Sequence, residues 1–405
     1  TAGHPESAAR DHYDNGTLVT PPDDFYSTDY YTGKLIDYIG HDRGDGRPFF
    51  AYLAFQAVHF PLQVPDAYLD LYKGKYDAGY AVIRAARIAK QKELGIIPQD
   101  FQESPGDEAT MIRFGQPGVL LNDPWEKLSA SDQQSEARVM EIFAGMLSNV
   151  DDNVGKLIDY LKQAGVYDNT LIVFVSDNGA DGMGYGFIPY TDTEDPTSVA
   201  GIDNSLANYG RPSSFVFRST RWAEVGTAPF RLFKGFTAEG GIGVPAIVHL
   251  PGANPGAGNA VLSGLKDVVP TVLELAGVAD TGAQYGGHAV AAIEGRSLMP
   301  ALSGSDAQVH ADAEVFADEV NDIRYVRRGP WKMTRVVNYM VPSAAEFIDH
   351  DWQLYNLDTD RGETTDVSAA NPDIVAELKA DWAAYVTRVN AVNPVLPPIV
   401  TPMDQ

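Results

Sequence analysis

The stretch LIVFVSDNGADG, residues 171–182, decides how the rest of the chain is interpreted. It opens with five apolar residues, mostly β-branched or aromatic, which is typical of a strand buried on both faces. In residues 135–165, just before it, apolar side chains recur every three or four positions. This spacing predicts the longest helix of the chain, ended by Gly165. The order helix, short turn, strand predicts a βαβ-type parallel sheet.

Further elements are predicted on both sides of this unit. Two more apolar runs of strand length indicate buried strands, PFFAYLAF at residues 48–55 and VPAIVHLPG at residues 244–252. Helical spacing predicts helices over residues 25–40 and 266–276. Residues 86–135 are polar and contain several prolines, so we expect a long, irregular excursion with short helices there.

The last hundred residues have a different pattern. After a stretch rich in Gly, Ser and Ala near residues 303–313, four β-type runs follow at short spacing, and a helix begins at PDIVAELK. This order predicts a small antiparallel sheet with one helix packed on it. We therefore expect an α/β domain over residues 1–305 and an antiparallel-sheet subdomain over residues 306–405.

Composition narrows the classes of function. The 405 residues include no cysteine, which excludes disulfides and thiolate metal sites in this chain, and the net charge is −25. Such an acidic chain repels phosphate backbones, so we expect no nucleic-acid partner, and an anionic substrate would need a locally basic pocket. No apolar run has the roughly 20 residues of a membrane span. The oligomeric state is open, with a monomer slightly favoured.

Four residues near the predicted strand ends are candidates for chemistry, since ligands of open α/β sheets bind at the carboxyl ends of strands. His59 follows the first strand, Asp177 and Asn178 follow the second, and Lys234 precedes the third. Asp177 and Asn178 offer two oxygen ligands to Ca²⁺ or Mg²⁺, although Asp-Asn-Gly is also a common turn. His59 could bind an anion or donate a proton, and Lys234 could pair with an anionic ester. Taken singly, a hydrogen-bonded loop histidine and a solvated surface lysine are the better explanations of these two residues, and only the combination of the candidates favours a functional site.

Several phrases in order resemble a known family: RPFFAYLAFQAVHFPLQ, LIVFVSDNGADG, APFRLFKGFTAEGGIGVP and VVPTVLELAGV. They are similar to formylglycine-dependent sulfatases of the alkaline-phosphatase superfamily, bacterial arylsulfatases above all. The resemblance implies an alkaline-phosphatase-like, mostly parallel sheet flanked by helices, and hydrolysis of sulfate esters, in particular aryl sulfates. It implies that Asp177 and Asn178 bind a divalent cation, usually Ca²⁺. His59 and Lys234 would hold the sulfate group and the bridging oxygen of a small sulfated substrate.

The chain also departs from the family pattern. The family's first aspartate pair, its Cys/Ser-x-Pro-x-Arg motif and its Gly-Lys-x-His motif are not found, so we expect the formylglycine only in an N-terminal segment that is absent from this chain. The stretch from Thr227 to Arg231 has the motif's spacing by coincidence, with Thr first. Gly243 stands where the family usually has Arg, which puts a local ion pair in doubt. Two alternatives stay open: a non-catalytic sulfatase-like protein, and a phosphodiesterase or phosphonate monoester hydrolase of the same superfamily.

Overall fold

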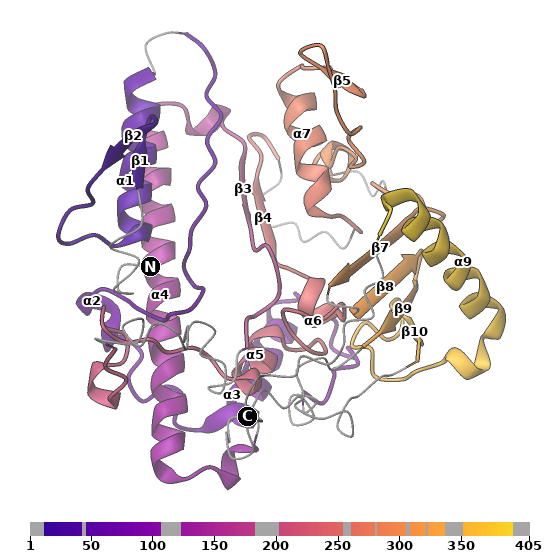
Figure 1. Ribbon diagram of the computed structural model, residues 1–405, viewed down its shortest axis with the longest axis horizontal. Coiled ribbons are helices and arrows are strands. Elements are labelled where there is room, and N and C mark those ends of the chain that lie inside the picture. Colours follow the sequence, from indigo (N-terminus) through magenta and orange to yellow (C-terminus); the bar gives the residue numbers. More distant parts are fainter. Residues whose placement is uncertain are drawn as a thin grey trace, which may run out of the picture.

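The computed structural model (Figure 1) describes residues 12–42, 46–106, 123–182, 202–253, 261–279, 282–304, 308–320, 323–336 and 351–391. Its helices are α1 (Ser27–Asp42), α2 (Asp66–Leu69), α3 (Gly79–Glu93), α4 (Ala130–Gln163), α5 (Thr220–Thr227), α6 (Glu239–Ile242), α7 (Val268–Leu275), α8 (Met299–Leu302) and α9 (Pro372–Val389). Its strands are β1 (His12–Asp14), β2 (Thr17–Val19), β3 (Ile172–Val175), β4 (Ala246–His249), β5 (Gln284–Tyr285), β6 (His288–Ala289), β7 (Val315–Val320), β8 (Ile323–Arg328), β9 (Trp331–Arg335) and β10 (Gln353–Asn356).

The longest helix, α4, confirms the prediction for residues 135–165. It begins at a Ser129 cap, whose hydroxyl accepts a hydrogen bond from the backbone N–H of Asp132. It ends before Gly165, which has a φ of +69° and so turns the chain where other residues would be strained. α1 runs along α4 (Figure 1), and Asn153 donates a hydrogen bond to Asp29 across the two helices at 2.7 Å. No helix in the described part of the chain is long and apolar enough to cross a membrane.

A buried carboxyl group joins α4 to two other helices. Glu136 of α4 is fully buried, and its Oε2 accepts hydrogen bonds from Tyr80 of α3 at 3.0 Å and from Ser219, the cap of α5, at 2.7 Å. The Glu136 carbonyl accepts a third from the indole of Trp222. Burial raises the pKa of Glu136 to about 7, although the hydrogen bonds from Ser219 and Tyr80 oppose this shift.

The strand that opens residues 171–182 is present as β3, but its pairing differs from the prediction. β3 and β4 pair antiparallel, with Ile172 opposite His249 and Val175 opposite Ala246. Between these two strands the expected parallel arrangement is therefore wrong. Nor are they buried on both faces within the described residues, since Ile247 is 66% exposed. An apolar sequence predicts that a strand can be covered, whereas its partner and direction depend on distant segments.

Residues 48–55 form no strand in the structure, so that prediction is wrong for this segment. The run is a coil with exposed aromatic side chains, Phe50 at 80% and Tyr52 at 81%. A strand requires a neighbour to accept its backbone hydrogen bonds, and no described segment pairs with this one. The apolar character that indicated burial is instead presented to solvent.

The predicted excursion over residues 86–135 contains helices, as expected, but they are longer than predicted. It includes most of α3 and the first turns of α4, while residues 107–122 lie outside the described part of the chain. The polar composition was misleading because α3 buries only a narrow face, formed by Tyr80 and Ile88.

The C-terminal region confirms the predicted antiparallel sheet and helix. The strands lie in the order β10-β9-β8-β7, all antiparallel, and α9 covers one face (Figure 1). On that face Val326, Met333 and Leu354 pack against Leu378 and Trp382 of α9.

The opposite face of this sheet packs on the segment that carries Lys234. Ile323 joins a buried cluster with Leu232, Phe233 and Phe236. The sheet is therefore covered on both faces, by α9 on one side and by this segment on the other. The division of the chain at residues 305 and 306 stays a prediction.

We predict that Glu136 makes stability depend on pH. Its pKa is higher in the folded protein than the usual value of 4.5, so the folded state binds more protons than the unfolded state between about pH 4.5 and pH 7. The free energy of unfolding should therefore fall as the pH rises through this interval, by roughly 3 kcal/mol for this group alone. Glu136→Gln should remove that fall, which urea unfolding at about pH 5 and about pH 8 would measure.

Glu126→Gln, at an exposed position, provides the matched control and should keep the wild-type dependence on pH. An equal difference between Glu136→Gln and wild type at both pH values would show that Glu136 does not titrate in this way.

Candidate active site

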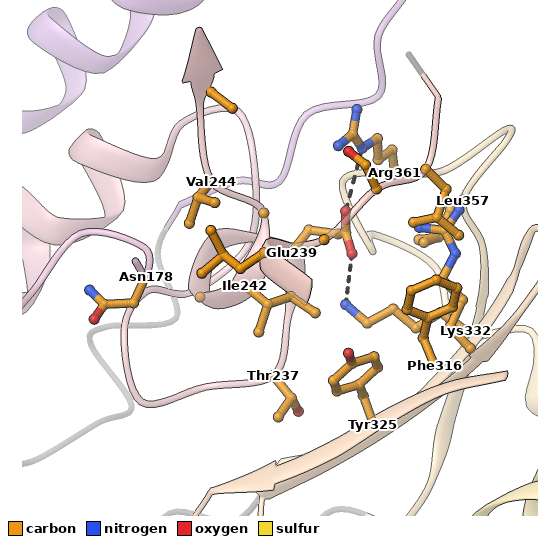
Figure 2. A pocket seen from close by; sticks show the side chains of 18 of the residues that line it. Asn178, Thr237, Glu239, Ile242, Val244, Phe316, Tyr325, Lys332, Leu357 and Arg361 are labelled. Atoms are coloured by element: carbon orange, nitrogen blue, oxygen red, sulfur yellow. Dashed lines mark hydrogen bonds and ion pairs between the residues drawn. The ribbon is translucent and has the colours of Figure 1, made fainter. Parts of the chain in front are cut away.

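Three separate segments bring the predicted residues to one cavity. His59 follows the exposed coil, Asp177 and Asn178 follow β3, and Lys234 lies in the loop between α5 and α6. All four line a cavity of about 1650 Å³ that also reaches the C-terminal sheet; Figure 2 shows the part near that sheet. The structure thus places them together, while their chemical roles stay predictions.

His59 and Lys234 are in direct contact. The Nζ of Lys234 lies 3.1 Å from the Nε2 of His59. The other ring nitrogen, Nδ1, is 2.8 Å from the carbonyl oxygen of Phe60, which can only accept a hydrogen bond. Nδ1 therefore carries the proton in neutral His59, and Nε2 is left to accept from the lysine ammonium. This arrangement directs a cation and an imidazole edge to the same point of the cavity.

Asp181 completes the contact and was missed by the sequence analysis. Its Oδ2 lies 3.0 Å from the Nζ of Lys234 and 3.3 Å from the Nε2 of His59. Its backbone carbonyl accepts a hydrogen bond from the buried guanidinium of Arg218 at 3.1 Å. Burial lowers the pKa of Arg218 to about 10, while Asp181 opposes this shift. Asp181 thus forms an ion pair with Lys234, and it can accept a hydrogen bond from His59 only when Nε2 also carries a proton.

The turn formed by residues 177–179 packs tightly on the loop that carries Lys234. The backbone N–H of Gly179 donates to the carbonyl of Gly241 at 2.9 Å. A Cβ atom at Gly179 would lie 1.9 Å from the carbonyl oxygen of Gly240, so only glycine allows this approach. Asp177 is exposed, and Asn178 donates from Nδ2 to the carbonyl of Gly179 at 2.8 Å, which leaves Oδ1 as its ligand atom.

Asp177 and Asn178 do not make a complete cation site. Calcium takes about 6–8 oxygen ligands, and these two side chains supply a fraction of that number. Among the residues that the structure describes, no group of three or more His, Asp or Glu side chains could hold a metal ion. The donor set has the right chemistry for a hard cation but is too small to bind one alone.

A second charged cluster missed by the sequence analysis lies behind this loop. Lys332 of β9 is fully buried, and its Nζ is 2.9 Å from Glu239 of α6 and 2.9 Å from Glu363. Glu239 also lies 3.4 Å from the guanidinium of Arg361. Glu239 therefore has two basic partners although Gly243 carries no side chain.

The Thr227 stretch, which matches the family motif only in spacing, has a structural role. Arg231 is buried and donates to the hydroxyl of Tyr355 at 2.8 Å and to the side chain of Gln353 at 3.3 Å, both on β10. The x-x-Pro-x-Arg spacing that begins at Thr227 is thus accounted for by a contact with the C-terminal sheet.

Comparison with known proteins identifies the family. The sulfatase family model matches residues 2–278. An uncharacterized sulfatase of Schizosaccharomyces pombe is 36% identical over 370 residues, which are 91% of this chain and 63% of that protein. An arylsulfatase of Klebsiella aerogenes is 38% identical over 266 residues, 65% of this chain and 53% of the enzyme. The chain thus spans roughly three fifths or less of the length of these relatives.

A solved structure shares the fold. The crystal structure of Ps i-CgsB has a TM-score of 0.54 and 22% identity, and the match covers 92% of this chain and 56% of that one. This likeness supports the α/β fold expected from the sequence, with its small C-terminal antiparallel sheet. Together with the family model, which covers more than half of the chain, these matches show that the chain belongs to the sulfatase family.

Proposed function

We propose that the full-length protein hydrolyses sulfate esters, aryl sulfates in particular. The observation that carries this proposal is the contact of Lys234 with His59 at a cavity that Asp177 and Asn178 also line. Membership of the sulfatase family and the similarity to an arylsulfatase support it. On this proposal the protein is a sulfuric ester hydrolase acting on small sulfated substrates.

His59 and Lys234 act on the charge that develops during cleavage. As the sulfur–oxygen bond breaks, negative charge grows on the sulfuryl oxygens and on the leaving oxygen. Side chains already fixed in position stabilise that charge without a cost of reorganisation. The Lys234 ammonium supplies a point charge, and His59, once protonated, can donate a proton to the leaving oxygen. Asp181 orients Lys234 through their ion pair, and it can orient His59 once Nε2 of the imidazole is protonated.

On this proposal the nucleophile and part of the cation site lie outside residues 1–405. The chain has no cysteine and no Ser-x-Pro-x-Arg, so a formylglycine would be formed in a segment that precedes Thr1. We propose that the same segment supplies the remaining ligands of a divalent cation, Ca²⁺, beside Asp177 and Asn178. The bound cation would neutralise charge on the sulfate oxygens.

We predict that His59→Ala and Lys234→Ala each lower the kcat of the full-length protein on an aryl sulfate by about 100-fold or more, since each removes a fixed charge or donor. Release of a chromogenic aryl alcohol measures this loss. His288→Ala and Lys90→Ala, at exposed positions outside the cavity lining, are matched controls and should keep wild-type rates. Wild-type turnover in both cavity variants contradicts the roles. If the protein hydrolysed a phosphate diester and not the aryl sulfate, it would be a phosphodiesterase. If it hydrolysed neither substrate, it would be a non-catalytic relative of the sulfatases.

We also expect activity to depend on a divalent cation. Chelation of the full-length protein should abolish turnover of the aryl sulfate, and added Ca²⁺ should restore it. Asp177→Asn should raise the Ca²⁺ concentration needed for half-maximal activity by about 10-fold or more, because a charged oxygen ligand becomes neutral. Asp159→Asn, on α4 and outside the cavity lining, is the control. Full activity after chelation, or an unchanged requirement in Asp177→Asn, would argue against a cation held by Asp177.

The isolated chain Thr1–Gln405 should show no turnover, because covalent catalysis has no substitute for the missing nucleophile. It should also self-associate, since Phe50, Tyr52 and Ile247 expose apolar surface, and β3 and β4 have no further strand partner among the described residues. Turnover of an aryl sulfate and light scattering of the purified chain test both statements. A monomeric, stable and active chain would refute the proposal that a catalytic segment is missing.

A further inference from the structure

The loop that carries Lys234 is held on one side by the turn with the candidate metal ligands. The backbone N–H of Lys234 donates to the carbonyl of Ala180 at 3.0 Å, and Gly241 accepts from Gly179 at 2.9 Å. These bonds, together with the close approach of glycine backbones, fix the loop to residues 177–182. Any displacement of the loop therefore changes the place of Lys234 relative to His59 and Asp181.

The other side of the loop is held by the C-terminal sheet. The hydroxyl of Thr237 contacts the carbonyl of Arg324 on β8 at 3.0 Å and the hydroxyl of Thr334 on β9 at 2.9 Å. Two residues on, Glu239 meets Lys332. Side chains alternate along β9, so Lys332 and Thr334 face the loop while Met333 faces α9.

Figure 2 shows Glu239 between Arg361 on one side and Lys332 on the other. The second carboxylate, Glu363, contacts Lys332 through Oε1 and accepts the backbone N–H of Glu239 through Oε2 at 2.9 Å. Two carboxylates from separate segments thus converge on one ammonium. Because the backbone of Glu239 is bound as well as its side chain, the cluster fixes the start of α6.

Because the cluster is buried, the charges of its members depend on one another. Removal from water opposes the charged form of Lys332, but Glu239 and Glu363 outweigh it and raise the pKa of Lys332 above its usual value. Burial likewise opposes ionisation of Glu239, whose pKa Lys332 and Arg361 nevertheless lower to about 2. A buried charge without its partners is strongly unfavourable, so each member keeps the others in place.

We propose that Lys332 is a positioning residue for Lys234. By binding Glu239 and Glu363 it fixes the loop over residues 234–242, and it thereby sets the contact of the Lys234 ammonium with His59 and Asp181. The C-terminal sheet then takes part in the geometry of the site without touching the reacting atoms. The proposal deepens the proposed function, on which its kinetic consequence rests.

The test uses Lys332→Met in the full-length protein, which keeps the length of the side chain and removes its charge. With Lys234 displaced, stabilisation of the leaving oxygen should be lost mainly in the transition state. We therefore expect kcat on an aryl sulfate to fall by about 10-fold or more while KM changes by less than about 3-fold. The imidazole NMR signals of His59 should move, because the cation beside its Nε2 moves.

Leu378→Ala is the matched control. Leu378 is a buried residue of α9 that packs on the far face of the same sheet, so its truncation loosens the sheet without touching the loop. Its melting temperature should fall at least as much as that of Lys332→Met, while kcat and the His59 signals stay as in wild type. Equal changes in the two variants would mean that Lys332 acts only through stability, which overturns the proposal.

A milder variant covers the case in which Lys332→Met does not fold. Thr237→Val removes the neutral hydrogen bonds to β8 and β9, and should shift the His59 signals in the same direction by a smaller amount. Unchanged His59 signals in every variant that folds would overturn the proposal. Because these signals report geometry, they remain decisive if the protein turns over no sulfate ester, an outcome that would refute the proposed function alone.

Discussion

The buried ammonium of Lys332 is the constraint on which the arrangement of this molecule depends. It lies on the inner face of β9, out of contact with water, and such a charge is tolerated only when opposite charges surround it. Those charges come from Glu239 and Glu363, which flank the sheet in the sequence. The strands, the loop and the turn near residue 363 must therefore assemble together. The geometry of the candidate site therefore depends on the same contacts that hold the C-terminal strands in place.

Features with a local signal were predictable from the sequence. The period of α4, its Ser129 cap and the glycine after it all lie within a few residues of one another. The four C-terminal strands and α9 were equally clear, because β-type runs that follow one another along the chain pair with their neighbours. The rule that functional residues follow strands selected His59, Asp177 and Asn178, and all three line one cavity in the structure. The segment before His59, which was expected to be a strand, is a coil.

Features that depend on distant partners were not predictable. The apolar run at residues 48–55 has the composition of a buried strand, but composition does not supply the neighbour that a strand needs. The relative direction of β3 and β4 was predicted wrongly for the same reason, since it also depends on segments distant in the sequence. Lys332 was missed because a lysine in a strand is ordinarily solvated, and only the covering of both faces of β9 shows that it is buried. Asp181 lies within the stretch LIVFVSDNGADG, yet nothing in its spacing indicated that it faces Lys234.

The contact between Asp181 and Lys234 also bears on how an acidic protein could bind an anion. With a net charge of −25, the chain as a whole repels sulfate, so attraction must come from cations fixed at the cavity. Lys234 is such a cation, but Asp181 already compensates its charge at 3.0 Å. On the proposed function, an incoming sulfate ester would share the ammonium with this carboxylate, which would weaken binding of the ground state. In the proposed reaction, the contact of Lys234 with the leaving oxygen would strengthen as negative charge develops on that oxygen. The partial neutralisation of Lys234 by Asp181 would then reduce the affinity for the substrate more than it reduces the stabilisation of the transition state.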